Sequence, residues 1–306
     1  MGKHVIVGAG QVGAHLAAKL LGMGHEVTVV TRSGSGPDGV RKVAASAADR
    51  DRLVQVTRGA DALYNCMNPR YHEWPQVWPP VAASLLGTAE QTGAALVTLG
   101  NLYMYGPAGG RPMTEDLPMD APGTKGRIRA RMWEDMIASH RAGRARVTEL
   151  RASDYYGPGS SDQAYVGTVR FVRPLLAGKR VTFLSDPSIP HAWTYTPDVA
   201  TALAVAGTDE RALGRVWHVP TGPAVSAREF GERLCELAGA PAPRIGRLPR
   251  PVFNAIGLAV PMMRELQETR YQFDEPYRLD SSAFETTFGV RPTPLDDGLR
   301  AVIAAA

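Results

Sequence analysis

Short apolar runs alternate with amphipathic stretches along the first half of the chain. Val5-Ile6-Val7 is a β-branched run typical of a strand buried on both faces, and the apolar residues of 14–21 are spaced to face a sheet. Asp49 is the expected N-cap of a later helix. Strands are predicted at 5–7, 26–30, 40–44, 62–67, 95–99 and 146–151, and helices at 14–21, 49–58, 81–93 and 127–141. This alternation predicts an α/β fold with a doubly wound parallel sheet.

The loop between the first strand and the first helix carries a glycine pattern. Gly8, Gly10 and Gly13 form a GxGxxG motif with a strand before it and a helix and second strand after it, which indicates dinucleotide binding. Gly8 is expected to make the tight turn, Gly10 to admit the pyrophosphate, and Gly13 to let helix and strand pack closely. The pyrophosphate would lie at the helix N-terminus. Gln11 and Val12 of the same loop belong to the predicted cofactor site.

The end of the second strand predicts the choice of cofactor. NAD sites place a carboxylate there, whereas NADP sites favour an arginine. This strand ends in Thr31-Arg32-Ser33 without a carboxylate, so Arg32 can pair with a 2′-phosphate and the two hydroxyls can donate hydrogen bonds to it. The alternative is a solvated loop arginine. The sequence therefore favours NADP(H), with Met67 at the end of the fourth strand also in the cofactor site.

Composition narrows the class of protein. A chain of 306 residues with 44% hydrophobic and 21% charged residues is ordinary for a globular protein of one large domain or two coupled ones. The formal charge of +4 suits a phosphate-bearing ligand but gives no argument for nucleic acid. Cys66 and Cys235 are expected to be buried, with no zinc site or disulfide. The immediate first strand leaves no room for a signal peptide, and the apolar run 252–263 is too short to span a membrane, so a soluble cytoplasmic protein is expected.

Further motifs follow along nearly the whole chain. Tyr105-Gly106 follows the fifth predicted strand, and Leu150-Arg151 leads through Tyr156-Gly157-Pro158-Gly159. Others lie at 114–118, 193–200, 216–230, 279–281, 288–289 and 293–295. In this order they resemble the extended short-chain dehydrogenase/reductases of the epimerase/dehydratase branch. The resemblance implies a Rossmann core at 1–156 and, at 157–306, remaining sheet strands interleaved with a smaller substrate-binding domain. It also implies a homodimer formed through two helices of the sheet.

The chain departs from this family at the catalytic motif. The family uses a YxxxK tyrosine and lysine on one helix with a nearby serine or threonine. The tyrosine exchanges a proton with the substrate oxygen, and the lysine lowers its pKa and holds the ribose. With Tyr105-Gly106 as the anchor, Asn101, Gly126 and Ala130 stand at the serine, tyrosine and lysine positions. The whole triad is missing.

Other polar residues are candidates for the roles of the missing triad. Asn101 stands where the family's serine points into the site, and residues two apart in an extended segment share a face, so Tyr103 is the predicted proton donor and Asn101 holds the oxygen. Leu102 and Met104 would then turn toward packing, and the alternative is that Tyr103 only lines the pocket. Asp154, two residues before the second Tyr-Gly motif, completes the predicted catalytic set.

Several charged residues have alternative interpretations. Lys125 and Arg129 are one helical turn apart and can hold the ribose or an anionic substrate, although Lys125, Arg127, Arg129 and Arg131 also fit a solvated helix face. Lys125 is included in the predicted cofactor site. His191 and His218 stand isolated in the sequence and are interpreted as packed or solvated. His72-Glu73 lacks the second histidine of a metalloprotease, and no metal site is predicted.

Three functions are compatible with these residues. The first is an NADPH-dependent oxidoreductase that reduces or epimerises a small carbonyl or imine metabolite. The second is an NADP-binding sensor or regulator without redox chemistry. The third is an enzyme that performs acid/base cyclisation or elimination while the nucleotide is structural. A small-molecule substrate is expected, with no nucleic acid and no membrane partner.

Overall fold

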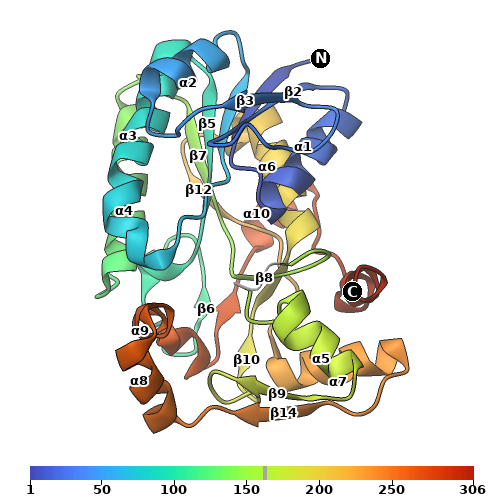
Figure 1. Ribbon diagram of the computed structural model, residues 1–306. Helices are drawn as coiled ribbons and strands as arrows, with labels where there is room; N and C mark the ends of the chain where they lie inside the picture. Colours follow the sequence, from blue (N-terminus) through green and yellow to red (C-terminus); the bar gives the residue numbers. More distant parts are fainter. Residues whose placement is uncertain (161–163) are drawn as a thin grey trace.

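A seven-stranded parallel sheet forms the centre of the computed structural model, which describes residues 1–160 and 164–306 (Figure 1). The strand order β12-β7-β5-β4-β1-β2-β3 reverses direction between β1 and β4. That reversal is the point where α/β folds bind ligands beyond the carboxyl ends of the strands. The strands are β1 Lys3–Val7, β2 Glu26–Thr31, β3 Arg41–Ala44, β4 Ala62–Asn65, β5 Ala95–Gly100, β7 Val147–Arg151 and β12 Val216–His218. The predicted doubly wound parallel sheet is confirmed.

Helices cover both faces of this sheet (Figure 1). One face carries α1 Gln11–Gly22 and α6 Thr196–Thr208, and the other carries α2 Arg50–Thr57, α3 Trp74–Thr92 and α4 Thr124–Arg141. Alternate residues of β1 supply the two cores, since Ile6 packs with α1 and α6 while Val5 and Val7 pack with α2 and α3. The sheet is therefore buried on both sides, as its continuous apolar strands require.

Two local predictions differ from the structure and one is confirmed. Asp49 caps α2, because its side chain accepts a hydrogen bond from the Arg52 N–H. α3 begins at Trp74 rather than at 81: Pro75 lies in its first turn, where the missing N–H costs nothing, and Pro79 and Pro80 lie inside it. Residues Tyr103–Tyr105 form the 3₁₀ turn η2 and not an extended segment.

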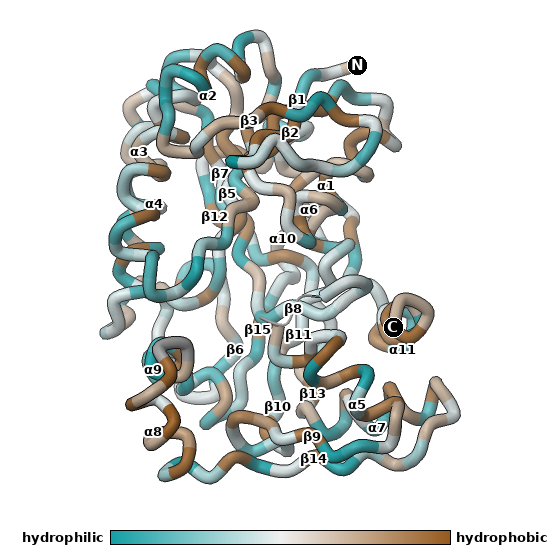
Figure 2. The backbone as a smooth tube through the Cα atoms, in the orientation of Figure 1, coloured by the Kyte–Doolittle hydropathy of each residue, from teal (hydrophilic) through white to brown (hydrophobic). Residues whose placement is uncertain are grey.

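The chain after β7 builds a second, smaller layer and returns to the sheet with α6 and β12. β8 Asp154–Tyr156 pairs in parallel with β11 Trp193–Tyr195, and the next elements, α6 and β12, belong to the large layer. An aromatic core with Phe171, Phe183 and Phe230 fills the smaller layer, and Figure 2 shows apolar positions there and along α8.

The remaining elements contribute no strand to the seven-stranded sheet. The strands are β6 Pro112–Met113, β9 Arg180–Phe183, β10 Pro190–His191, β13 Val225–Ser226, β14 Arg244–Arg247 and β15 Arg278–Leu279. The helices are α5 Arg173–Leu176, α7 Ala227–Ala238, α8 Arg250–Ala259, α9 Pro261–Glu268, α10 Ser282–Phe288 and α11 Leu295–Ala304. The single-turn elements are η1 Tyr71–Glu73, η3 Thr168–Val172, η4 Glu210–Ala212 and η5 Arg270–Phe273.

The apolar run at 252–263 divides between α8 and α9, with Pro261 starting the second helix. Within the described residues no helix has the length and apolar character needed to cross a membrane. Cys66 and Cys235 are both buried and unbridged, which confirms their predicted burial.

Candidate active site

The glycines of the nucleotide loop differ in the space around them. Gly8 has φ +101°, a turn conformation that disfavours a side chain. A Cβ on Gly13 would lie 2.0 Å from the Gly8 carbonyl oxygen, so close packing excludes a side chain at Gly13. A Cβ on Gly10 would meet nothing within 4 Å. Gly10 is also the N-cap of α1, whose first turn contains no acidic residue. The loop thus leaves an open space at a helix N-terminus, which fits a dinucleotide pyrophosphate.

The residues predicted to hold a 2′-phosphate, Thr31, Arg32 and Ser33, lie at the end of β2 and in the turn that follows it. The Thr31 hydroxyl donates to the Ser35 carbonyl oxygen at 2.8 Å, and the Ser33 and Ser35 hydroxyls are 2.8 Å apart. Arg32 is exposed and forms no ion pair with any described residue. The Arg32 guanidinium is therefore able to receive a phosphate without exchanging a hydrogen bond. At the end of β4, the Met67 N–H donates to the Asn65 side chain at 3.2 Å.

Packing closes position 126, which the sequence comparison with Tyr105-Gly106 as anchor predicts to correspond to the family's catalytic tyrosine. A Cβ on Gly126 would lie 2.4 Å from the Ala121 Cβ and 2.6 Å from the Tyr103 carbonyl oxygen. Ala130, at the lysine position, is buried. η2 thus packs against α4 so closely that Gly126 cannot accept a side chain without movement of the backbone. These contacts leave no room for a tyrosine side chain at position 126.

Tyr103 lies next to this contact and is paired with a second phenol. Its hydroxyl is 2.5 Å from the Tyr71 hydroxyl, and its ring stacks on Trp74. Burial raises the pKa of Tyr103 well above its usual value and that of Tyr71 to about 12, so both phenols are protonated at neutral pH. The extended register predicted for Asn101 and Tyr103 is wrong, because the chain turns at η2 and the Asn101 side chain accepts from the Tyr103 N–H at 3.2 Å. Leu102 and Met104 are buried, as expected.

The basic residues of α4 divide between two environments. Lys125 and Arg129 are buried, whereas Arg127 and Arg131 are exposed. Lys125 Nζ contacts Glu265 Oε2 at 2.5 Å, Glu268 Oε2 at 3.1 Å and the Glu265 carbonyl oxygen at 3.3 Å, so α9 engages all three of its donors. The Arg129 guanidinium lies 4.9 Å and 4.3 Å from the ring centroids of Trp74 and Trp78. Lys125 can reach a ribose only if α9 moves.

Asp154 and His191 form a pair that the sequence did not indicate. Trp193 lies opposite Asp154 in the β8–β11 pairing, and His191 Nε2 is 2.8 Å from Asp154 Oδ2. The description of His191 as isolated is therefore wrong. Its ring stacks on Phe273, with centroids 4.4 Å apart. His218 is packed, as predicted, but is not isolated, because it contacts the Tyr105 hydroxyl.

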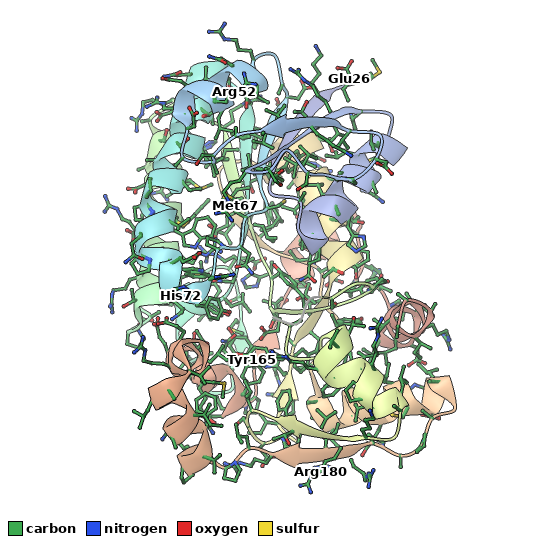
Figure 3. All side chains as sticks on the ribbon, viewed as in Figure 1. Glu26, Arg52, Met67, His72, Tyr165 and Arg180 are labelled. Carbon is green, nitrogen blue, oxygen red and sulfur yellow. The ribbon has the colours of Figure 1, made fainter. Side chains whose placement is uncertain are left out.

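A buried arginine lies in the same C-terminal part of the site. The Arg270 Nε donates to Asp274 Oδ1 at 3.3 Å, while its two terminal nitrogens are buried without a partner among the described residues. The Tyr277 hydroxyl is also buried and unpartnered there. Figure 3 shows Tyr165 between the sheet and this C-terminal part, where its ring lies 4.2 Å from that of Phe273. Unsatisfied buried donors are rare, so this region is suited to a polar ligand.

These features match one known family. The model of the NAD-dependent epimerase/dehydratase family matches residues 4–219. The chain belongs to this family. A dTDP-glucose 4,6-dehydratase of an Actinoplanes species is 26% identical, covering 97% of this chain and 95% of that protein. A UDP-N-acetyl-alpha-D-glucosaminuronate decarboxylase of Bacillus cytotoxicus is 22% identical over 75% of this chain and 78% of its own length.

Solved structures share the fold. The UDP-glucose 4-epimerase of Thermus thermophilus, in complex with NAD, has a TM-score of 0.79 at 22% identity, covering 99% of this chain and 98% of that one. The UDP-glucose 4-epimerase of Thermotoga maritima, with UDP-glucose, has a TM-score of 0.81 at 17% identity and the same coverage. The family resemblance and the fold predicted from the sequence are thus confirmed.

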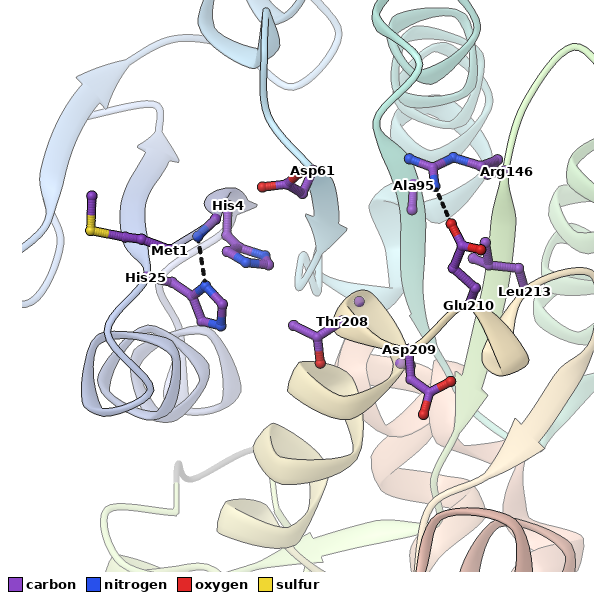
Figure 4. Close-up of a pocket in the computed structure, with 13 residues that line it drawn as sticks. Met1, His4, His25, Asp61, Ala95, Arg146, Thr208, Asp209, Glu210 and Leu213 are labelled. Atoms are coloured by element: carbon purple, nitrogen blue, oxygen red, sulfur yellow. Dashed lines mark hydrogen bonds and ion pairs between the residues drawn. The ribbon is translucent and has the colours of Figure 1, made fainter.

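A surface depression lies away from the edge of the sheet that carries the predicted site residues. That depression has a volume of about 390 Å³ and lies at the amino ends of the strands (Figure 4). His4, His25 and Asp61 line it, and burial lowers the pKa of His4 to about 4. Ligands of doubly wound sheets bind at the opposite, carboxyl edge, where the predicted site residues lie.

Proposed function

We propose that this family member is an NADP(H)-dependent oxidoreductase that reduces or epimerises a small carbonyl or imine metabolite, with Tyr103 as the proton donor. The single observation that supports it is the Tyr71–Tyr103 pair, whose hydroxyls are 2.5 Å apart beside the closed Gly126 position. The Tyr103 phenol lies on η2, close to the end of β5. The acid needed for carbonyl reduction is therefore available at a new position.

The residues of the chain have separate roles in this proposal. The cofactor, when bound, supplies or accepts the hydride. Asn101 holds the substrate oxygen through its side-chain N–H group, because its oxygen already accepts from the Tyr103 N–H. Tyr103 gives the proton to that oxygen, and Tyr71 donates a hydrogen bond that stabilises the resulting phenolate. Asp154 assists as a nearby carboxylate.

The test removes the hydroxyl oxygen of Tyr103. NADPH oxidation is first measured with a panel of aldehydes, ketones and imines, and the best substrate is then used with Tyr103→Phe. Turnover should fall on the order of a hundredfold while cofactor binding survives. Tyr195→Phe is the control, because Tyr195 contacts Tyr156 and lies outside the phenol pair. Wild-type turnover in Tyr103→Phe would show that another group donates the proton.

Arg270 supports a finer statement about the substrate. Its two terminal guanidinium nitrogens, which are buried and have no hydrogen-bond partner among residues 1–160 and 164–306, favour a substrate with an anionic group, such as the diphosphate of the nucleotide sugars named for the relatives. UDP and dTDP should then raise the thermal unfolding midpoint of the wild type and leave Arg270→Met unchanged. Equal shifts in both proteins would place the anion elsewhere.

The alternatives are an NADP-binding sensor and a non-redox acid/base enzyme. The Asp154–His191 pair favours an enzyme over a sensor, because a buried carboxylate–imidazole contact is suited to proton transfer. Proton exchange at a substrate carbon without any change in NADPH absorbance would favour the non-redox enzyme.

A further inference from the structure

The outer face of α8 exposes a cluster of apolar side chains. Among the described residues seven large apolar side chains are exposed, and four of the seven fall within residues 252–260. Single apolar residues scattered over a surface are normal, whereas a cluster of them marks an interaction site. The four are Val252 at 45%, Ile256 at 36%, Leu258 at 89% and Val260 at 42% exposure.

The inner face of α8 is apolar as well. Phe253 is buried there, with its ring centroid 4.9 Å from the Arg270 guanidinium carbon, and a Cβ on Gly257 would lie 2.6 Å from Gln267 Nε2 of α9. After Arg250 at its start, α8 contains one polar residue, Asn254. A helix that is apolar all round is normally covered on all sides. This chain covers α8 on one side, so the outer face is suited to contact with another body.

Basic residues surround this outer face. β14 leads directly into α8, and Arg244 of β14 lies opposite Arg180 in the β9–β14 pairing, although like charges on paired strands repel each other. Figure 3 shows Arg180 at the lower end of the molecule, where Figure 1 places α8, β9 and β14. The exposed basic residues of this end are Lys179, Arg180, Arg244, Arg247, Arg250 and Arg264.

Few carboxylates offset this positive charge. Residues 179–186 and 237–264 contain these six basic residues and a single acidic one, Asp186, which lies 4.0 Å from Arg247. The next acidic residues along the chain, Glu265 and Glu268 of α9, contact Lys125. The end of the molecule formed by α8, β9 and β14 therefore combines exposed apolar side chains with an excess of positive charge.

We propose that this docking face, the outer side of α8 with the basic residues around it, binds the surface of a membrane that contains anionic lipids. The apolar side chains of α8 enter the boundary between headgroups and acyl chains, and the arginines bind lipid phosphates. The expectation of no membrane partner followed from the length of the run 252–263, which is too short for a span. A helix that lies in the bilayer surface needs an apolar face and basic residues instead of length.

A second copy of this chain fits the docking face less well. A closed symmetric dimer places the same patch of both copies against each other. The arginines beside α8, Arg244, Arg247 and Arg250, would then face the same arginines of the other copy. An anionic lipid surface has the complementary charge and attracts each of them.

Vesicle binding by the full chain tests the proposal. Cosedimentation is measured with vesicles of phosphatidylcholine alone and with vesicles of an equimolar mixture of phosphatidylcholine and phosphatidylglycerol. The protein should bind the mixed vesicles at least about tenfold more tightly, and this binding should weaken as the salt concentration rises. The measurement needs no cofactor and no substrate, so failure of the proposed reaction would not affect it.

Two variants separate the apolar contribution from the charge. Leu258→Glu should weaken binding to the mixed vesicles at least about tenfold, because an inserted apolar side chain is replaced by a like charge. Met23→Glu is its control, at an exposed methionine that follows α1. Arg250→Glu should weaken binding at least about fivefold. Arg52→Glu is its control, because Arg52 of α2 lies at the opposite end of the molecule (Figure 3).

The thermal unfolding midpoint of Leu258→Glu should match that of the wild type, since the side chain is 89% exposed. Absence of wild-type binding to the mixed vesicles would overturn the proposal. A loss of binding in Arg250→Glu but not in Leu258→Glu would also overturn it, because adsorption by charge alone would then explain the binding. Size-exclusion chromatography with light scattering checks the remaining occupant. A wild-type dimer that Leu258→Glu dissociates would assign the docking face to a second copy of the chain and overturn the proposal.

Discussion

Single residues of the nucleotide loop show how position decides the effect of one added side chain. Gly10 has φ −69° and ψ −169°, an extended conformation that any residue adopts, and open space lies where its Cβ would be. Gly13 has no such space. Two glycines of one motif therefore serve different purposes, ligand approach and packing.

We expect Gly10→Val to abolish NADP(H) binding while the protein stays folded. The valine would occupy the pyrophosphate's space and not the core. Gly13→Ala is the contrast, because its Cβ would overlap the Gly8 carbonyl oxygen and lower the free energy of unfolding. Cofactor titration and thermal unfolding check both variants. Normal binding by Gly10→Val would mean that the loop has another function.

A second residue, Arg32, sets the expected preference between cofactors. We expect NADP(H) to bind at least about tenfold more tightly than NAD(H), because a guanidinium–phosphate pair contributes about 1.5–3 kcal/mol. Arg32→Ala should remove this preference and leave NAD(H) binding unchanged. Titration of both cofactors against both proteins measures it, and equal wild-type affinities would contradict it.

At the scale of elements, local pattern predicted most strands and helices but not how they meet. The apolar periods located the six predicted strands, and Asp49 marked the start of α2. The start of α3 lies before the predicted one, because Pro75 fits the first turn of a helix although Pro79 and Pro80 interrupt the helical pattern. The partners of Asp154 and Lys125 were missed for another reason. His191 and Glu268 lie 37 and 143 residues away from them, and no local pattern encodes such pairs.

The attachment of α9 is an element-scale feature that can be tested. None of the described side chains of α9 is buried. Among the described residues, its hydrogen bonds to α4 run through Lys125, whose Nζ and backbone N–H contact Glu265 and Glu268. We expect Lys125→Met to speed hydrogen exchange in residues 250–268 about tenfold, because charged hydrogen bonds contribute about 1.5–3 kcal/mol each.

The measurement is hydrogen exchange followed by mass spectrometry, with α7 as the internal reference. α7 has its own capping box at Ser226 and Glu229 and packs in a separate aromatic core, so its exchange should not change. Exchange in 250–268 that stays at the wild-type rate would show that other contacts hold α9.

At the scale of the whole molecule, the chain leaves the sheet after β7 and returns to it at β12. Three distant segments meet at His218 on this strand. Its Nε2 lies 2.8 Å from the Tyr105 hydroxyl of η2, and its Nδ1 lies 2.8 Å from the Asp280 carbonyl oxygen. Nδ1 must donate to the carbonyl, so a neutral Nε2 accepts from the phenol. The junction therefore requires an uncharged imidazole.

This requirement predicts a loss of stability in weak acid. Burial lowers the pKa of His218 from 6.5 to about 4, whereas in the unfolded chain it takes up a proton near 6.5. The unfolded state then binds more protons between these values, so the contribution is complete above about pH 6.5 and is lost as the pH falls toward 4. At about pH 5 the loss should be roughly 2 kcal/mol. Denaturant unfolding at several pH values measures this loss. His218→Asn should be less stable than the wild type, but its free energy of unfolding should fall less between pH 6.5 and pH 4. His4 titrates in the same window, so the difference between the two curves isolates His218. Parallel curves for the two proteins would contradict this assignment.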